Sequence, residues 1–374
     1  MTFGYMTFKH PENRKIIAGC ILFAAGFILL LLARNFPGFA QWYSTHIYPI
    51  WTGTLGRLAG IFPFSVSELL LYAVLFCIIF TFLKALFSSF RKKGIKFFTQ
   101  FSSRLLGLFL FASVLFLLYA LNCGINYHRK SFADSAGLQL EEYTVQELKD
   151  VCVWLTGEIN ERSSQVERNE EGLMEFPTSK EDEWDVNEKA VEAMKRLGED
   201  SPSLSGFYPK PKGLIFSWIL SVQQLTGIYS PFTVEANYNS DAVDYSVPFT
   251  ACHELSHLKG FMQEEEANFI AFLASSTSDD VTFQYSGYLM GWTYCMNTLY
   301  RADYDTWEKV RETLRPEIET DLAANREFWA KYDTKAAEVS NKINDTYLKA
   351  NKQNEGVNSY NKMVDLIVAY RRQY

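Results

Sequence analysis

Histidine is scarce in this sequence, and positive charge is not in excess. The 374 residues include five histidines, and 36 Lys and Arg stand against 43 Asp and Glu. Few imidazoles are therefore available for a metal site or for acid–base catalysis. A net negative chain also lacks the cations that neutralise nucleic-acid phosphates, so we expect no nucleic-acid partner.

Cysteine is sparse as well, with six residues and no CxxC pair. Cys20 and Cys77 lie inside apolar runs and are expected to be small apolar residues there. The other four could form one or two disulfides on an oxidising side of a membrane, but their spacing predicts no particular pairing.

Long apolar runs are abundant, and all lie in the first third of the chain. They cover residues 16–33, 69–87 and 105–121, and basic residues flank the first. About 20 apolar residues cross the hydrocarbon core of a bilayer. No small-residue cleavage pattern follows the first run, which distinguishes it from a signal peptide. We therefore predict three transmembrane helices.

The charge distribution predicts the orientation and the domains. Residues 1–122 contain 11 Lys and Arg against 2 Asp and Glu, which leaves 25 against 41 for residues 123–374. The basic segments precede the first span and separate the second from the third, and basic loops stay cytoplasmic. We expect a membrane domain over 1–122 with a cytoplasmic N-terminus, and an extracytoplasmic domain over 123–374.

The segment between the first two spans, residues 41–68, is rich in aromatics. Trp42, Tyr43, Tyr48 and Trp51 are the residue types that favour a membrane–water interface. This segment is expected to contain a short helix lying on the lipid bilayer.

The remainder of the chain is predicted to be mostly helical with one β element. Apolar residues recur at helical spacing after Leu138, whereas residues 228–238 are punctuated by Gly and Pro and favour one or two short strands. Pro248 suits the first turn of a following helix, and Gly260 is a helix-stop signal. The fold class is therefore mainly α, with a short β element before the helix at 248–259.

That helix carries the sequence HELSH. His253 and His257 are four residues apart and share a helix face, so both can bind one metal ion. Glu254 has the general-base position of zinc hydrolases, beside a metal-activated water. The alternative is a helix face that binds no metal.

A catalytic zinc site needs a third protein ligand. The other three histidines are poorly placed, because His10 is expected to be cytoplasmic, His46 lies in the loop between the first two spans and His128 is close to the membrane. Position 263, where metzincins have their third histidine, is Gln263. The third ligand is then a carboxylate from Glu264, Glu265 or Glu266.

The residues EEEAN at 264–268 resemble the E-x-x-A-D signature on the second helix of gluzincin-type membrane peptidases, such as prenyl-protein peptidases and bacterial heat-shock membrane proteases. The resemblance implies that Glu264 binds Zn²⁺, with Glu266 in reserve, and that Asn268 supports a histidine ligand. Asn268 replaces the aspartate of that pattern, and the short gap after His257 requires a tight turn at Gly260.

A broader resemblance covers nearly the whole chain. The three spans and the stretches YSPFTVEANYN, PFTACHELSHLKGF, EEEANFIAFLA, YSGYL and YLKANKQNEGVNSY are similar to an uncharacterised bacterial membrane family, domain of unknown function 3810. This resemblance implies a zinc metallopeptidase of a bacterial cytoplasmic membrane, with a zincin-like extracytoplasmic domain and no assigned substrate.

The expected function is therefore a membrane-anchored zinc metallopeptidase acting on a peptide or protein. Residues 229–237 are a candidate edge strand for a substrate peptide. Tyr288, or otherwise Tyr360, is a candidate donor to the oxyanion of the tetrahedral intermediate. The alternative is a non-catalytic membrane sensor or partner-binding protein built on the same zinc-binding domain.

Overall fold

The computed structural model describes residues 11–89, 95–177, 184–351, 353 and 362–373. The chain divides into two compact units, each of which is described by itself. Unit 1 comprises Met1–Tyr48, Val66–Arg129 and Pro231–Thr233, and unit 2 comprises Pro49–Ser65, Lys130–Ser230 and Val234–Tyr374. Pro49–Ser65 thus folds with the second unit.

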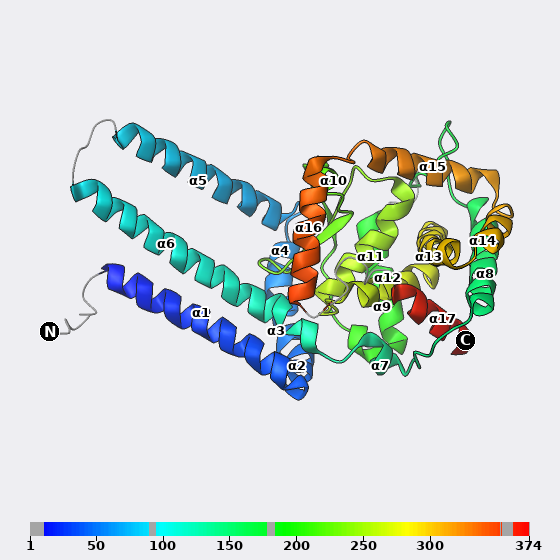
Figure 1. The fold of residues 1–374 in the computed structure, drawn as a ribbon, viewed down its shortest axis with the longest axis horizontal. Coiled ribbons are helices and arrows are strands. Elements are labelled where there is room, and N and C mark those ends of the chain that lie inside the picture. Colours follow the sequence, from blue (N-terminus) through cyan, green and yellow to red (C-terminus); the bar gives the residue numbers. More distant parts are fainter. Residues whose placement is uncertain (1–10, 90–94, 178–183, 352, 354–361, 374) are drawn as a thin grey trace. The chain divides into compact units, whose positions relative to one another are not determined.

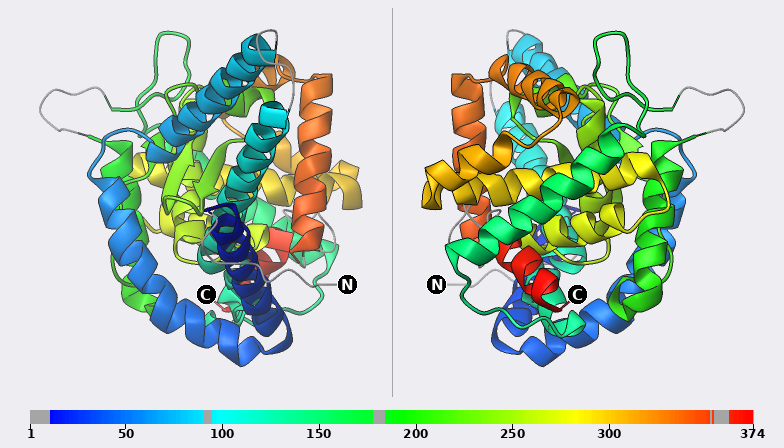
Figure 2. Two further views of the ribbon diagram at one scale, coloured as in Figure 1. Left: turned by 90° about the vertical axis from the view of Figure 1, so that its left-hand side faces the viewer. Right: turned by 90° about the vertical axis from the view of Figure 1, so that its right-hand side faces the viewer.

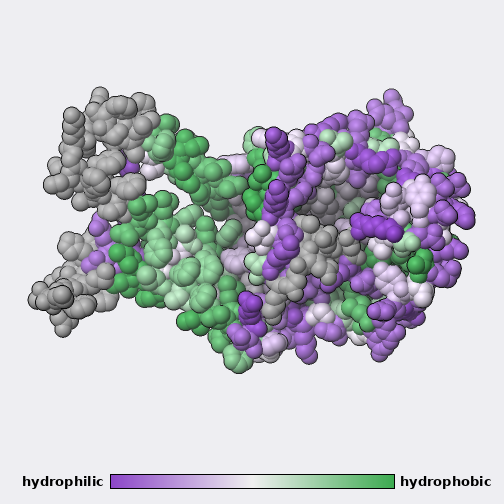
Figure 3. Space-filling model, in the orientation of Figure 1, coloured by the Kyte–Doolittle hydropathy of each residue, from purple (hydrophilic) through white to green (hydrophobic). Residues whose placement is uncertain are grey.

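Unit 1 is built on three long apolar helices (Figure 1), which are α1 (Pro11–Asn35), α5 (Val66–Ser89) and α6 (Ile95–Tyr119). Each contains or begins an apolar stretch long enough to cross a membrane, at Glu12–Asn35, Val66–Lys84 and Ser103–His128. Few of their described residues are buried, and the apolar side chains give this unit a hydrophobic surface (Figure 3). The three predicted spans are thus confirmed as helices that could span a membrane.

Helices α1 and α6 pack closely because glycine and aromatic side chains face one another. The Phe23 and Phe116 rings stack with centroids 4.7 Å apart. A Cβ on Gly26 would lie 3.1 Å from the Phe116 ring, so a larger residue at this position would require the ring to shift by a few tenths of an ångström.

The chain between α1 and α5 is helical from Pro37 to Gly60. It consists of α2 (Pro37–Trp42), α3 (Tyr48–Trp51) and α4 (Arg57–Gly60), joined by two π-helical segments at Tyr43–Ile47 and Thr52–Gly56. Pro37 sits in the first turn, where its missing N–H costs no hydrogen bond. Figure 2 shows this stretch in blue as a continuous run of helix.

Unit 2 is mainly helical. Its helices are α7 (Phe132–Ala136), α8 (Val145–Ser163), α9 (Val186–Asp200), α10 (Trp218–Val222), α11 (Val247–Leu258), α12 (Glu264–Ser276), α13 (Val281–Ala302), α14 (Tyr304–Arg311), α15 (Pro316–Ala330), α16 (Lys335–Ala350) and α17 (Met363–Gln373).

Side-chain caps fix several of the helix starts. Thr144 and Glu147 form a capping box at the start of α8, and Asp280 accepts hydrogen bonds from two N–H groups at the start of α13. The centre of the unit is α11, whose residues are all buried, packed against α12 and α13. Trp292 of α13 donates to the Thr156 hydroxyl of α8 at 2.9 Å, which satisfies a buried indole N–H.

Unit 2 also contains a three-stranded sheet with the order β1 (Lys212–Gly213), β3 (Glu235–Tyr238), β2 (Gly227–Ser230). Strand β1 is parallel to β3, and β2 is antiparallel to it. The segment expected to form one or two strands forms two, and both precede α11. Among the described residues, none of the six cysteines forms a disulfide.

Candidate metal centre

The HELSH helix forms where the sequence predicts it. Helix α11 has Pro248 in its first turn and ends at Leu258, close to the stop expected at Gly260. His253 and His257 lie one turn apart on the same face, with their ring centroids 4.6 Å apart.

The turn after α11 brings the next helix back to these histidines. Gly260 adopts a left-handed conformation with φ 87°, which glycine accepts without a steric penalty. The N–H of Phe261 bonds the Ser256 carbonyl at 3.1 Å and that of Gly260 bonds the His257 carbonyl at 2.8 Å, as in a Schellman motif. This is the tight turn that the short gap after His257 requires.

The same turn orients His257. Its Nδ1 lies 2.8 Å from the Phe261 carbonyl oxygen, which accepts the Nδ1–H. Nε2 of that tautomer carries a lone pair and is directed at Glu264. A hydrogen bond of this kind from the non-ligating nitrogen to a carbonyl is the usual support of a metal-binding histidine.

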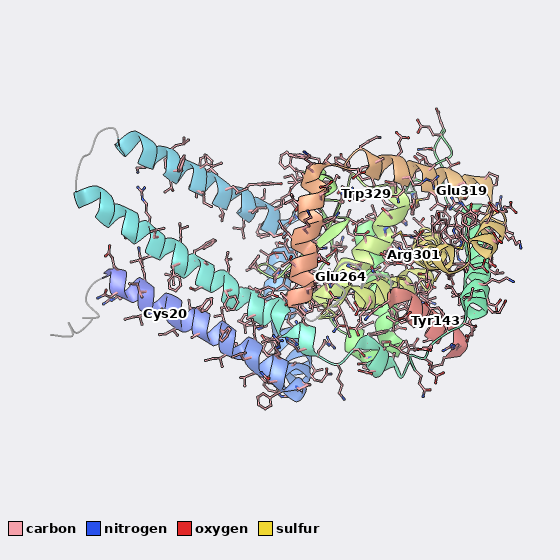
Figure 4. The ribbon with its side chains drawn as sticks, viewed as in Figure 1. Cys20, Tyr143, Glu264, Arg301, Glu319 and Trp329 are labelled. Carbon is pink, nitrogen blue, oxygen red and sulfur yellow. The ribbon has the colours of Figure 1, made fainter. Side chains whose placement is uncertain are left out.

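Glu264 is the first residue of α12, and Figure 4 labels it there. Its Oε2 lies 3.3 Å from His253 Nε2 and 3.7 Å from His257 Nε2, and the three donor atoms all fall within 4.8 Å of one another. Ligand atoms about 2.0–2.1 Å from a tetrahedral zinc ion are about 3.3–3.4 Å apart. The two separations from Glu264 are close to this spacing, and imidazole and carboxylate are donors that zinc accepts.

The two neighbouring glutamates have other partners. Glu266 is buried, and its Oε1 accepts the backbone N–H of Phe132 at 2.7 Å. Glu265 accepts from the Gln353 side-chain amide at 2.6 Å. Of the three acidic residues proposed for the third ligand, Glu264 is the one that the structure brings to the histidines.

The three clustered side chains shift one another's pKa. Burial lowers the pKa of His253 and outweighs the opposing effect of Glu264. Burial acts in the same direction on His257, but there the Glu264 carboxylate prevails and raises the pKa to about 9. Burial alone would raise the pKa of Glu264, yet the two imidazoles hold it well below its usual range. A metal ion must therefore compete with a proton for His257.

Glu254 lies beside this cluster and is only 3% exposed. Burial raises its pKa to about 8, and its Oε2 has no hydrogen-bond partner among the described residues. A buried carboxylate oxygen without a partner is costly, and such groups are typical of functional sites.

Strand β2 reaches Glu254 at a glycine. A Cβ on Gly227 would lie 2.8 Å from Glu254 Cγ and 2.9 Å from the Asn237 carbonyl oxygen. Any larger residue would displace either the strand or the glutamate, so the absence of a side chain allows the strand to approach the site. Sequence analysis did not identify this role of Gly227.

Asn268 lies one turn after Glu264 in α12, and its side chain interacts with His253. This is the position at which the resemblance to gluzincins predicts support of a histidine ligand. The Asn268 Nδ2 and the His253 Nδ1 have no partner with good hydrogen-bond geometry in the described part of the chain.

Helix α13 places a tyrosine next to Asn268. A Cβ on Gly287 would lie 2.7 Å from that of Ser275, and one on Gly291 would lie 2.7 Å from the Phe272 ring, so both glycines sit against α12. Tyr294 continues this face of α13 by one turn. It interacts with Asn268 and with the charge of Glu264, and burial raises its pKa.

Tyr288 lies on another face of α13. Its ring makes edge contacts with Trp154 and Phe272 at centroid distances of 6.0 and 6.1 Å, and Arg162 stacks over it at 4.6 Å. None of these partners belongs to the His–His–Glu cluster. Tyr360, the other tyrosine considered, lies outside the described residues.

The spacing of Gly287, Gly291 and Tyr294 was a signal in the sequence that would have favoured Tyr294 over Tyr288. Small residues four apart mark the face on which two helices approach closely. The residue three positions further on shares that face.

These observations define a mainly helical chain with three helices that could span a membrane and a His–His–Glu cluster next to a buried glutamate. The chain belongs to the DUF3810 family of proteins of unknown function, whose sequence pattern matches residues 43–368. No curated protein and no solved structure matches the chain.

Proposed function

We propose that this protein is a membrane-anchored, zinc-dependent metallopeptidase whose zincin-like catalytic domain lies outside the cytoplasmic membrane. The observation that carries the proposal is the convergence of His253, His257 and Glu264 at zinc-ligand spacing beside the buried Glu254. Two imidazoles and one carboxylate leave a fourth position open, as in catalytic zinc sites. A zinc ion held there would supply Lewis-acid polarisation of a peptide carbonyl.

Glu254 is the general base of the proposed reaction. Its carboxylate is buried next to the ligands, and a group with a pKa of about 8 is poised to accept and release a proton near neutral pH. We assign it the removal of a proton from the attacking water and the delivery of that proton to the leaving amine.

Strand β2 supplies the proposed substrate-binding edge. It is the outer strand beside β3, and Asn239 N–H bonds the Thr226 carbonyl at 2.7 Å. In an antiparallel pair the hydrogen-bonding residues alternate, so Gly227 directs its backbone groups away from β3. An extended peptide added at this edge would lie along Gly227 and hence next to Glu254.

Tyr294 is better placed than Tyr288 to donate to the oxyanion. Burial raises the pKa of its phenol, so the hydroxyl remains protonated and is able to donate. Its neighbours Asn268 and Glu264 place it beside the ligands.

A comparison of two variants tests the proposed mechanism. Glu254→Gln keeps the size of the side chain but cannot accept a proton, so peptide hydrolysis should fall about a hundredfold or more while bound zinc is retained. Glu161→Gln, at a side chain 70% exposed, is the matched control and should hydrolyse peptides like the parent. Unchanged turnover in Glu254→Gln would overturn the mechanism.

A second candidate function is a non-catalytic sensor or partner-binding protein built on the same zinc site. Asn268 favours it, because an amide supports a histidine ligand less strongly than a carboxylate would. Zinc binding without cleavage of any member of a peptide library, together with protection of residues 229–237 by a partner, would favour this alternative.

A further inference from the structure

The helical stretch Pro37–Gly60 connects two candidate membrane spans at very short distances along the chain. Pro37 is two residues after Asn35, where the first span ends, and Gly60 is six residues before Val66, where the second begins. If both helices span, these two span ends lie on the same side of the membrane.

These tethers limit how far the stretch can lie from the membrane. Gly60 is six residues from Val66, and six residues reach at most roughly 22 Å. Ile61 is one residue nearer and lies within about 18 Å of the start of the second span. The end of the stretch is therefore held close to the membrane surface.

The part of this stretch that belongs to unit 2 has two different faces. One face has small, buried residues and packs on the unit, since Gly56 lies against Val234 and the Ala59 carbonyl accepts from Lys212 Nζ at 2.7 Å. The other face exposes large apolar side chains, with Leu58 60% and Ile61 73% exposed. An exposed apolar stripe of this kind normally marks an interaction surface.

We propose that this exposed stripe, formed by Ile50, Leu58 and Ile61, is buried in the interfacial layer of the lipid bilayer and holds unit 2 against the membrane surface. The tethers to both spans argue for lipid as the occupant, because they keep the stripe within reach of the headgroup layer. Residues 123–374 contain 41 acidic and 25 basic residues, so their charge would not attract them to anionic lipid. Apolar insertion supplies the attachment that charge does not.

The stretch Pro37–Gly60 also contacts the sheet that lies next to the candidate metal centre. Lys212, whose ammonium bonds Ala59, also forms a buried ion pair with Glu235 of β3 at 2.6 Å. The proposal does not depend on the metal or on any enzymatic activity.

The test uses the full chain in lipid vesicles. Cys20 and Cys77, the two exposed cysteines, are replaced by serine, and the environment-sensitive fluorophore NBD is attached at Leu58→Cys or Ile61→Cys. Val153→Cys is the matched control, since Val153 is 50% exposed on α8. Nitroxide groups are then placed on the lipid chains close to the headgroups.

At positions 58 and 61 we expect blue-shifted emission and quenching by the nitroxide lipids of about twofold or more, unchanged in high salt because the attachment is apolar. The label at position 153 should be unquenched. Unquenched, solvent-like emission at both test positions would overturn the proposal. Blue-shifted emission without lipid quenching would overturn it as well, since it would mean that protein, such as a second copy of this chain, covers the stripe.

Discussion

Replacing Gly227 by alanine tests how closely the candidate substrate strand must approach Glu254, the proposed general base. The added methyl group would lie 2.8 Å from Glu254 Cγ and 2.9 Å from the Asn237 carbonyl oxygen, and would also overlap Glu254 Oε1. Ordinary contacts of this kind are about 3.5–4.0 Å, so strand or glutamate must move by roughly 1 Å. Overpacking of this size costs about 1–3 kcal/mol of stability.

The larger effect should be on hydrolysis. A displacement of about 1 Å at a reacting group lowers the rate by about a hundredfold. The zinc content should be unchanged, because His253, His257 and Glu264 come from α11 and α12 and not from β2. The assay is kcat/KM on a cleaved peptide, with zinc content and the unfolding temperature measured on the same samples.

Gly157→Ala is the control. This glycine lies within α8, and a Cβ added there meets nothing within 4 Å. Alanine there should be neutral or stabilise by up to about 1 kcal/mol, because it favours helix more than glycine does. If Gly227→Ala matched Gly157→Ala in kcat/KM and in unfolding temperature, the proposed approach of β2 to Glu254 would be refuted.

Three further outcomes are expected. Tyr294→Phe should lower kcat by about 10²–10³-fold with zinc retained, whereas Tyr288→Phe should stay close to the parent; equal effects would contradict the assignment of the oxyanion donor. Lys212→Met should cost about 3–5 kcal/mol by leaving Glu235 buried without its cation, and Lys212→Met/Glu235→Leu should recover much of this loss in chemical denaturation. Removing metal with a chelator should lower the unfolding temperature of the protein. Free zinc at a hundred times its Kd would stabilise the folded state by about 2.7 kcal/mol. An unchanged unfolding temperature would show that no tightly held ion was lost.

The parts of the fold that sequence analysis predicted are those determined by local pattern. The three spans and the HELSH helix have apolar runs or helix-start and helix-stop residues that act over a few neighbours. The preference for Glu264 came from a resemblance. The structure supplies a geometric reason, because the left-handed Gly260 returns the chain so that Glu264, and not Glu266, faces the histidines.

The parts that could not be predicted depend on contacts between distant segments. Strand β1 has two residues and no pattern of its own, so pairing with β3 alone defines it. The choice of Tyr294 over Tyr288 depends on which face of α13 packs on α12. Pro49–Ser65 folds with unit 2 through contacts to residues more than 140 positions away, such as the bond from Lys212 to Ala59, which no local pattern reveals.

The most direct test of the central claim is the metal content of the full chain, purified in detergent, beside a His257→Ala variant. We predict close to one zinc ion per chain in the parent and almost none in the variant, because His257 is one of the three protein ligands of the proposed site. A folded parent that holds no metal, even after zinc is added, would contradict the account and leave HELSH as a helix face without catalytic function.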